Sequence, residues 1–343
     1  KEIYENDHFK NITDAWLSGD HYKWRLMRAC GVPESRITGS ASDYEKFAAW
    51  CETVPKIIGN PLYTWTHLEL KRFFDIDLQV NPANAEEIWR LTNQKLAEQS
   101  FKRREIISNA QVKVVCTTDD PVDDLAYHRQ LAQEETRFKV LPSFRPDKGL
   151  NIDQAAFPSW VTQLSEASGL PITTYEEFIE ALGTRVDYFH QAGGRLSDHA
   201  LDVLRYEEID SDGLEAIFQK GIAGAPLSQI EIDAYRTETL SRLIHFYHEH
   251  GWTMQLHLHA YRNCNQRMLE QLGPDTGYDS INDLSITRHL QHLLNRAECS
   301  GQLPKTILYS LNPNDYPALM SLLGCFQKDV AGKLQLGSGW WYN

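Results

Sequence analysis

The segment Gly251–Met268, GWTMQLHLHAYRNCNQRM, combines the two features that decide the fold. From Thr253 to Ala260, polar and apolar residues alternate, which predicts a strand whose side chains point to two different faces. The alternation stops at residues 261–263, so this strand ends in two histidines, an arginine and an asparagine. Parallel α/β sheets and barrels hold their active sites at the carboxyl ends of strands, so the segment predicts an enzyme.

Similar segments occur on both sides of this strand. Six predicted strands alternate with predicted helices, and they cover residues 111–120, 138–146, 194–199, 253–260, 306–313 and 333–341. Such alternation builds a parallel sheet through right-handed crossovers. Every strand ends in polar, charged or indole groups, whereas an open sheet concentrates its ligand groups at one switch point. The pattern therefore favours an α/β fold of the (β/α)8 barrel type, of which six of eight strands are visible.

The first third of the chain has a different character. Residues 1–110 are predicted to be mainly helical, with Ser42 and Asp43 as a helix cap and with Gly31 and Gly59 each closing a helical segment. We therefore expect two regions, a helical insertion at 1–110 that follows a first strand absent from this chain, and barrel strands two to seven at 111–343.

Composition narrows the class of protein. The 34 basic and 47 acidic residues give a net charge of −13, which argues against nucleic acid or an anionic membrane as partner. The six cysteines form no C-x-x-C pair, so we expect free thiols in a reducing compartment. No apolar run approaches the roughly 20 residues of a membrane helix. A soluble, cytoplasmic protein is the simplest prediction.

His257 and His259 form a His-x-His on the central strand. Residues i and i+2 of a strand face the same side, so both imidazoles could reach one divalent metal ion. The alternative is that each histidine is simply hydrogen-bonded within a buried strand.

Two other strand ends carry candidate groups. Arg145 has the planar fork that binds a carboxylate or phosphate, or it pairs with Asp147 or another acidic residue of the chain. Asp198 and His199 could be an acid/base pair, with Asp198 orienting an imidazole or acting alone, or they could cap a loop.

Aromatic residues mark two further stretches. Gly337–Gly339 resembles a phosphate-binding turn only weakly, and Trp340 and Trp341 directly after it suit the wall of a sugar site. Asp20–Arg25, DHYKWR, carries more polar and aromatic groups than one amphipathic face explains, although a helix that is half surface and half core remains an alternative. The residues alone thus indicate a barrel enzyme for an anionic, polyhydroxylated small molecule.

Six stretches resemble uronate isomerase (glucuronate isomerase), a divergent family of the amidohydrolase superfamily, and they are residues 16–39, 60–70, 141–148, 254–281, 303–315 and 334–343. The resemblance runs from Lys1 to Asn343. It implies a distorted (β/α)8 barrel and an aldose–ketose isomerase of hexuronate catabolism. Such an enzyme interconverts D-glucuronate with D-fructuronate and D-galacturonate with D-tagaturonate, by proton transfer between C2 and C1 through an enediol. It also implies a divalent metal, expected to be zinc, and a homo-oligomer. A metal-dependent hydrolase of the superfamily and a sugar-acid binding protein are the alternatives.

The resemblance also assigns roles to individual residues. Its catalytic positions are His21, Tyr22, Asp198 and His257, and its substrate-binding positions are Arg145 and Arg262. Tyr22 would assist proton movement at C1 and C2, and Arg145 would bind substrate oxygens. His257 lies where hydrolases of the superfamily place a metal ligand, whereas His259 matches no family position.

The metal ligands of the family do not fall within this chain. The family's His-x-His lies on a strand before Lys1 and its Asp-x-Arg on a strand after Asn343, so we assign no metal ligand here and place His257 only as a possible neighbour. We expect residues 1–343 to be an interior portion of a longer protein. We also expect that this portion alone would neither fold stably nor catalyse, because a barrel without two adjacent strands exposes two edges.

Overall fold

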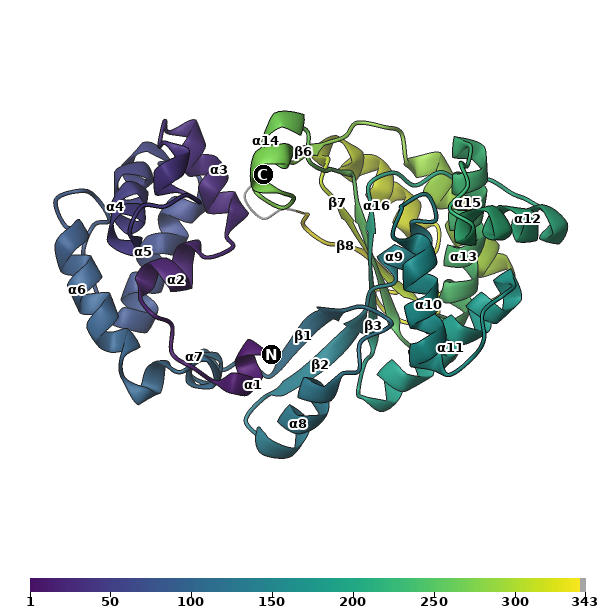
Figure 1. Ribbon diagram of the computed structural model, residues 1–343, viewed down its shortest axis with the longest axis horizontal. Coiled ribbons are helices and arrows are strands. Elements are labelled where there is room, and N and C mark those ends of the chain that lie inside the picture. The colour runs from purple at the N-terminus through teal and green to yellow at the C-terminus, as the bar shows by residue number, and fades with distance from the viewer. Residues whose placement is uncertain (340–343) are drawn as a thin grey trace. The chain divides into compact units, whose positions relative to one another are not determined.

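The computed structural model describes residues 1–339, which form two compact units (Figure 1). The helical unit consists of Lys1–Lys113 and Tyr261–Ser280, and the sheet unit consists of Val114–Ala260 and Ile281–Gly339. The structure therefore groups residues 261–280 with the N-terminal helices, although sequence analysis placed this segment among the barrel strands.

The helical unit is built from short helices, as the sequence predicts. Its helices are α1 (Glu2–Glu5), α2 (Ile12–Leu17), α3 (His21–Ala29), η1 (Glu34–Arg36), α4 (Asp43–Thr53), η2 (Val54–Lys56), α5 (Pro61–Phe74), α6 (Ala85–Leu96), η3 (Gln99–Phe101), α7 (Arg103–Asn109) and α14 (Gln266–Leu272). The predicted cap of α4 is confirmed, because the Ser42 hydroxyl accepts from the Glu45 amide and the Glu45 carboxylate accepts from the Ser42 amide. Phe47 and Trp50 of α4 are fully buried and anchor the core of this unit.

The six predicted strands are confirmed. They are β1 (Val114–Asp119), β2 (Lys139–Phe144), β3 (Leu196–Leu201), β4 (Thr253–Leu258), β7 (Lys305–Ser310) and β8 (Leu334–Leu336). They form one parallel sheet in the order β1-β2-β3-β4-β7-β8. Consecutive parallel strands separated by helices are the construction of a (β/α) barrel, so the predicted fold class is confirmed.

The helices of the sheet unit are α8 (Ala126–Glu134), α9 (Asp147–Leu150), α10 (Phe157–Ser168), α11 (Tyr175–Gln191), α12 (Ser211–Ile222), α13 (Gln229–Glu249), α15 (Thr287–Cys299), η4 (Pro313–Asp315) and α16 (Tyr316–Gly324). Figure 1 shows α9 to α13, α15 and α16 along one face of the sheet. Met254, Leu256 and Leu258 of β4 point into this helical layer and are fully buried. The alternate residues Gln255 and His257 lie on the opposite face and are only half-buried, which the period of the sequence predicts.

The end of β4 differs from the prediction. The strand stops at Leu258, and His259 has a positive φ of 72°, a left-handed conformation that breaks a strand. The chain then enters a two-stranded ribbon of β5 (Ala260–Tyr261) and β6 (Ser280–Ile281). The predicted strand through Ala260 is thus interrupted at His259. Among residues 1–339, no helix is long and apolar enough to cross a membrane.

Candidate active site

Asp198 and His257 form the centre of the polar face of the sheet. They come from the neighbouring parallel strands β3 and β4, and Asp198 Oδ1 lies 2.7 Å from His257 Nδ1. A carboxylate can only accept, so Nδ1 carries the proton and donates it to Asp198. The His257 side chain is 43 % exposed while Asp198 is buried. The second ring nitrogen, Nε2, is therefore the position at which His257 can act on another molecule.

The charge state of Asp198 follows from its neighbours. Burial would raise the pKa of its carboxyl group, but the hydrogen bond and charge of His257 and the charge of Arg145 outweigh burial. Together they hold the pKa of Asp198 below its ordinary value. Asp198 is thus an anion at neutral pH and stabilises a positive charge on His257.

Arg145 links this pair to a second carboxylate. Its Nη1 lies 3.3 Å from Asp198 Oδ2, and its Nε donates to Asp147 Oδ2 at 2.6 Å. The other oxygen of Asp147 accepts from the Ala200 amide at 3.1 Å, which ties the group to β3. The ion pair between Arg145 and Asp147 that sequence analysis weighed is confirmed. Arg145 consequently positions Asp198, and this role is independent of any contact between Arg145 and a substrate.

Asp198 does not orient His199. Consecutive residues of a strand point to opposite faces, and His199 lies fully buried under the helices beside Tyr247, with 5.6 Å between ring centroids. Neither ring nitrogen of His199 has a hydrogen-bond partner among the described residues. Burial lowers the pKa of His199 to about 4, so its imidazole is neutral. The version of the predicted acid/base pair in which Asp198 orients His199 is wrong, and the imidazole that Asp198 orients is that of His257.

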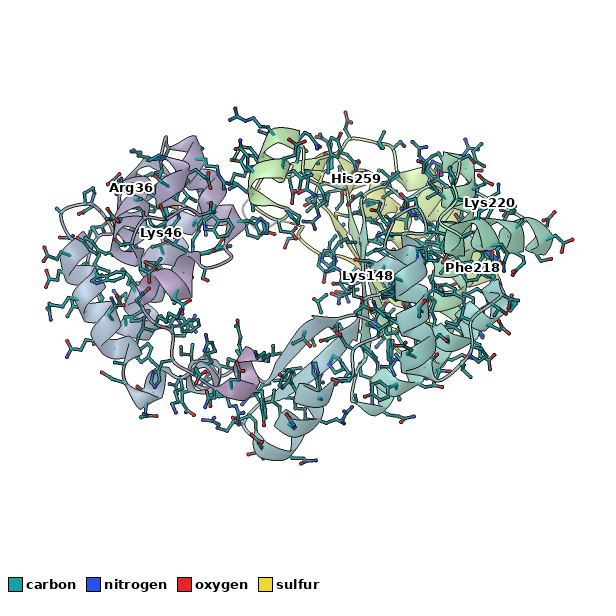
Figure 2. The ribbon with its side chains drawn as sticks, viewed as in Figure 1. Arg36, Lys46, Lys148, Phe218, Lys220 and His259 are labelled. Atoms are coloured by element: carbon teal, nitrogen blue, oxygen red, sulfur yellow. The ribbon has the colours of Figure 1, made fainter. Side chains whose placement is uncertain are left out.

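His259, labelled in Figure 2, has its own partners. Its Nε2 lies 2.9 Å from Asp315 Oδ2 and its Nδ1 lies 2.5 Å from Asn282 Oδ1, and the residue is 1 % exposed. The left-handed backbone at His259 ends the strand geometry that would have placed both histidines on one face. The His-x-His therefore forms no metal pair, and His259 holds the turn after β4.

Tyr22 and Arg262 come together in the helical unit. Tyr22 lies in the first turn of α3, with its ring 4.2 Å from that of His21. Burial raises the pKa of Tyr22, and the nearby charge of Arg262 opposes this rise. Arg262 Nη1 donates to Asp279 Oδ2 at 3.0 Å. The turn before Asp279 packs directly on α3, because a Cβ at Gly277 would lie 2.6 Å from the His21 carbonyl oxygen.

Several residues beside these groups escaped the sequence analysis. Asp279, Gln255 and Tyr309 each contact a predicted site residue or its neighbour. Strand alternation places Gln255 on the same face as His257, so the sequence pattern could have identified Gln255 as a neighbour of the site. The cross-strand partner Tyr309 depends on the register between β4 and β7, which no local pattern encodes.

The glycine-rich end of β8 has a packing role. A Cβ at Gly337 would lie 2.2 Å from Tyr309 Cε1, and a Cβ at Gly339 would lie 2.8 Å from the Ser310 carbonyl oxygen. Both glycines therefore permit close approach to β7. Trp340 and Trp341, the predicted sugar-binding wall, lie outside the described residues.

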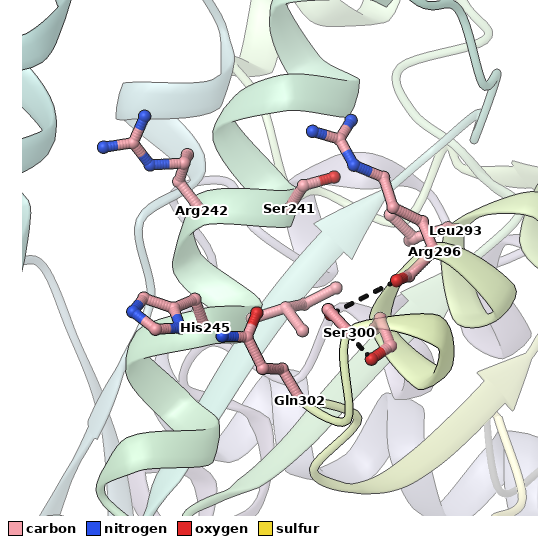
Figure 3. Close-up of a pocket in the computed structure, with 9 residues that line it drawn as sticks. Ser241, Arg242, His245, Leu293, Arg296, Ser300 and Gln302 are labelled. Atoms are coloured by element: carbon pink, nitrogen blue, oxygen red, sulfur yellow. Dashed lines mark hydrogen bonds between the residues drawn. The ribbon is translucent and has the colours of Figure 1, made fainter.

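A separate cavity of about 360 Å³ lies between α13 and α15 (Figure 3). Arg242 and Arg296 line it, but each already pairs with a glutamate, Glu176 at 2.8 Å and Glu238 at 2.6 Å. Both helices lie on the covered side of the sheet, opposite Gln255 and His257. This cavity is distinct from the site built around His257.

A parallel β/α sheet with a carboxylate-bound histidine and an arginine at its strand ends defines an enzyme of the barrel class. A family model described as glucuronate isomerase matches residues 1–343, and the chain belongs to this family.

Relatives and solved structures agree with this assignment. The chain is 52 % identical to the uronate isomerase of Bacillus subtilis over 345 residues, which cover 100 % of this chain and 73 % of the relative. The chain is also 52 % identical to the uronate isomerase of Caldicellulosiruptor saccharolyticus, over 100 % of this chain and 74 % of the relative. The crystal structure of uronate isomerase from Thermotoga maritima matches with a TM-score of 0.93 and 34 % identity, over 100 % of this chain and 74 % of that one. The glucuronate isomerase structure from Caulobacter crescentus, at 23 % identity, shares the fold with a TM-score of 0.89, over 99 % of this chain and 71 % of that one.

Proposed function

We propose that this protein interconverts D-glucuronate and D-fructuronate, and D-galacturonate and D-tagaturonate, as an aldose–ketose isomerase. The family and its relatives supply the reaction class. The observation that carries the proposal is the hydrogen bond between Asp198 and His257, which leaves Nε2 of a half-exposed imidazole available for proton transfer.

The proposed chemistry begins with the open-chain sugar. His257 Nε2 accepts the proton that leaves C2, and the electron pair forms the C1–C2 double bond while the C1 oxygen takes up a proton, which gives an enediol. The C2 hydroxyl then loses its proton as the carbonyl forms at C2, so that one hydroxyl proton has in effect moved from O2 to O1, and the proton held on Nε2 returns to C1. Asp198 accepts from Nδ1 throughout and stabilises the imidazolium formed in the first step. Arg145 holds Asp198 in place and is proposed to bind substrate oxygens as well.

The remaining site residues stay proposals that rest on the resemblance. Tyr22 is proposed to assist proton movement, and His21 and Arg262 to bind or act on the sugar acid. Burial keeps the Tyr22 hydroxyl protonated, so Tyr22 is suited to donate a proton rather than to remove one. Trp340 and Trp341 are proposed to contact the sugar ring.

A divalent metal, expected to be zinc, also remains a proposal. Zinc sites in proteins use three or four ligands, and within residues 1–339 no three His, Cys, Asp or Glu side chains are placed to share one ion. His257 Nε2 alone does not make a site, so the described residues do not fit the metal and no step above is assigned to it. We further propose a cytoplasmic location and a homo-oligomeric state.

A coupled assay for the ketose formed from D-glucuronate tests the function, with and without a chelator. We expect ketose from the wild type, expressed with whatever residues flank 1–343 in its gene, and a loss of at least 100-fold in His257→Gln. His250→Gln is the matched control, because His250 makes the same 2.7 Å contact with Asp187 away from the site, and it should keep wild-type activity. Absence of ketose would overturn the proposal in favour of a superfamily hydrolase or a binding protein, and loss of activity on chelation alone would support the metal.

A further inference from the structure

Tyr309 contacts the histidine of the site through its ring. His257 and Tyr309 are register partners on the adjacent strands β4 and β7, so their side chains stand on the same face. Their rings stack with 4.5 Å between centroids and 7° between planes. Two nearly parallel rings at this separation form an offset stack in van der Waals contact.

Tyr309 is itself held on two further sides. Its hydroxyl donates to Gln255 Oε1 at 2.9 Å, which ties the far end of the ring to the strand of His257. Gly337 lies against the ring edge so closely that a Cβ there would be 2.2 Å from Cε1 and 2.6 Å from Cδ1. Gly337 also donates its amide to the Leu308 carbonyl at 2.8 Å, which fixes β8 beside β7. The ring thus has little freedom to move away from His257.

The two contacts of His257 restrain different motions. The Asp198 hydrogen bond fixes the position of Nδ1, but one hydrogen bond leaves the imidazole able to tilt about that contact. The stacked Tyr309 ring resists this tilt, because a tilting imidazole would have to displace the Tyr309 ring or lose contact with it. We propose that Tyr309 is a positioning residue that holds the His257 ring in plane and aims Nε2, with Gln255 and Gly337 fixing Tyr309.

This inference rests on the proposed function for its kinetic consequence but not for its structural one. Tyr309→Leu removes the ring, and we expect kcat for D-glucuronate to fall on the order of 100-fold while KM changes less than threefold, because misalignment of a catalytic group by about 1 Å can cost that much. Tyr309→Phe keeps the stack and loses only the bond to Gln255, so it should retain kcat within about threefold. This rescue by the conservative variant distinguishes the stack from the hydroxyl.

A second tyrosine–histidine stack provides the control. Tyr206 stacks on His292 of α15 with 5.3 Å between centroids and 25° between planes. Tyr206→Leu removes a similar ring contact from a histidine that the mechanism does not use, and it should leave kcat unchanged. Should Tyr309→Leu fail to fold, Gly337→Ala decides the matter, because its methyl group must displace the Tyr309 ring and should lower kcat in the same direction.

The ¹⁵N spectrum of histidine-labelled protein gives a readout that needs no turnover. In the wild type and in Tyr309→Phe, the His257 ring signals should be single and sharp with the proton on Nδ1, and in Tyr309→Leu they should broaden because the ring can tilt about the Nδ1–Asp198 hydrogen bond. A wild type without isomerase activity would sink the proposed function, yet the spectra would still test the stack. An unchanged His257 spectrum, or a kcat of Tyr309→Leu within twofold of that of Tyr206→Leu, would overturn the inference.

Discussion

Replacing Asp198 with asparagine tests the centre of the site most directly. The asparagine oxygen can still accept from His257 Nδ1 at 2.7 Å, whereas its amide nitrogen replaces the oxygen that accepts from Arg145 Nη1. The negative charge and this longer 3.3 Å bond are therefore lost, and the bond to His257 is kept. Hydrogen bonds to charged groups contribute about 1.5–3 kcal/mol, against about 1 kcal/mol for neutral ones. Because Asp198 is buried, we expect the imidazolium that forms during proton transfer to lose about 2 kcal/mol of stabilisation.

That loss converts into a rate. At about 1.36 kcal/mol per tenfold, kcat for D-glucuronate should fall about 30-fold, with a smaller change in KM. Steady-state ketose formation measures both constants. Asp187→Asn is the matched control, because Asp187 makes the same 2.7 Å contact with a histidine, His250, at the ends of α11 and α13, and it should change kcat less than twofold.

A folded Asp198→Asn variant that keeps kcat within twofold of the wild type would contradict this role of the carboxylate. His257 would then act without help from the carboxylate, or would not carry the proton. A loss equal in both variants would instead show that any aspartate–histidine pair of this fold supports activity through stability alone.

Three further predictions concern binding and stability. Arg145→Met should raise KM for uronates at least tenfold if Arg145 binds substrate, and unchanged kinetics would remove it from the site. Ser42→Ala should lower the free energy of unfolding by about 1 kcal/mol in urea titrations through loss of the α4 cap, and no change would show that the cap is dispensable. His199 has a pKa lowered to about 4, so its unfolded form binds more protons below pH 6.5 and stability should fall by about 2 kcal/mol between pH 6.5 and pH 5. His199→Phe should flatten this part of the urea-derived stability profile, and an unchanged slope would contradict the assignment.

The strands could be predicted because burial of alternate residues is a local property. In β4, each even residue from Met254 to Leu258 lies in the core and each odd residue lies on the polar face. The same pattern correctly put His257 on the polar face, beside Gln255. The pattern failed at His259, where a left-handed backbone ends the strand. Residues other than glycine rarely adopt this conformation, so the sequence gives no sign of it.

The partners that site residues find on other strands could not be predicted, unlike the nearby pair of Arg145 and Asp147. Asp198 meets His257 rather than its neighbour His199 because side chains on adjacent strands meet according to register. The contacts of the segment around α14 likewise could not be predicted from local sequence. The Asp279 carbonyl accepts from Arg25 at 2.9 Å across more than 250 residues of chain, and no local signal marks this contact.

The charges around Arg145 determine how the kinetic effect of replacing it is interpreted. The Arg145 guanidinium is bonded to both Asp147 and Asp198, so one positive charge meets two carboxylates. Burial raises the pKa of Asp147, so a protonated Asp147 would leave this group closer to neutral. An approaching uronate anion therefore gains little net attraction from Arg145 unless Asp147 takes up a proton. If Arg145→Met lowers kcat more than it raises KM, Arg145 acts mainly by holding Asp198. If KM carries most of the change, substrate binding is its main role.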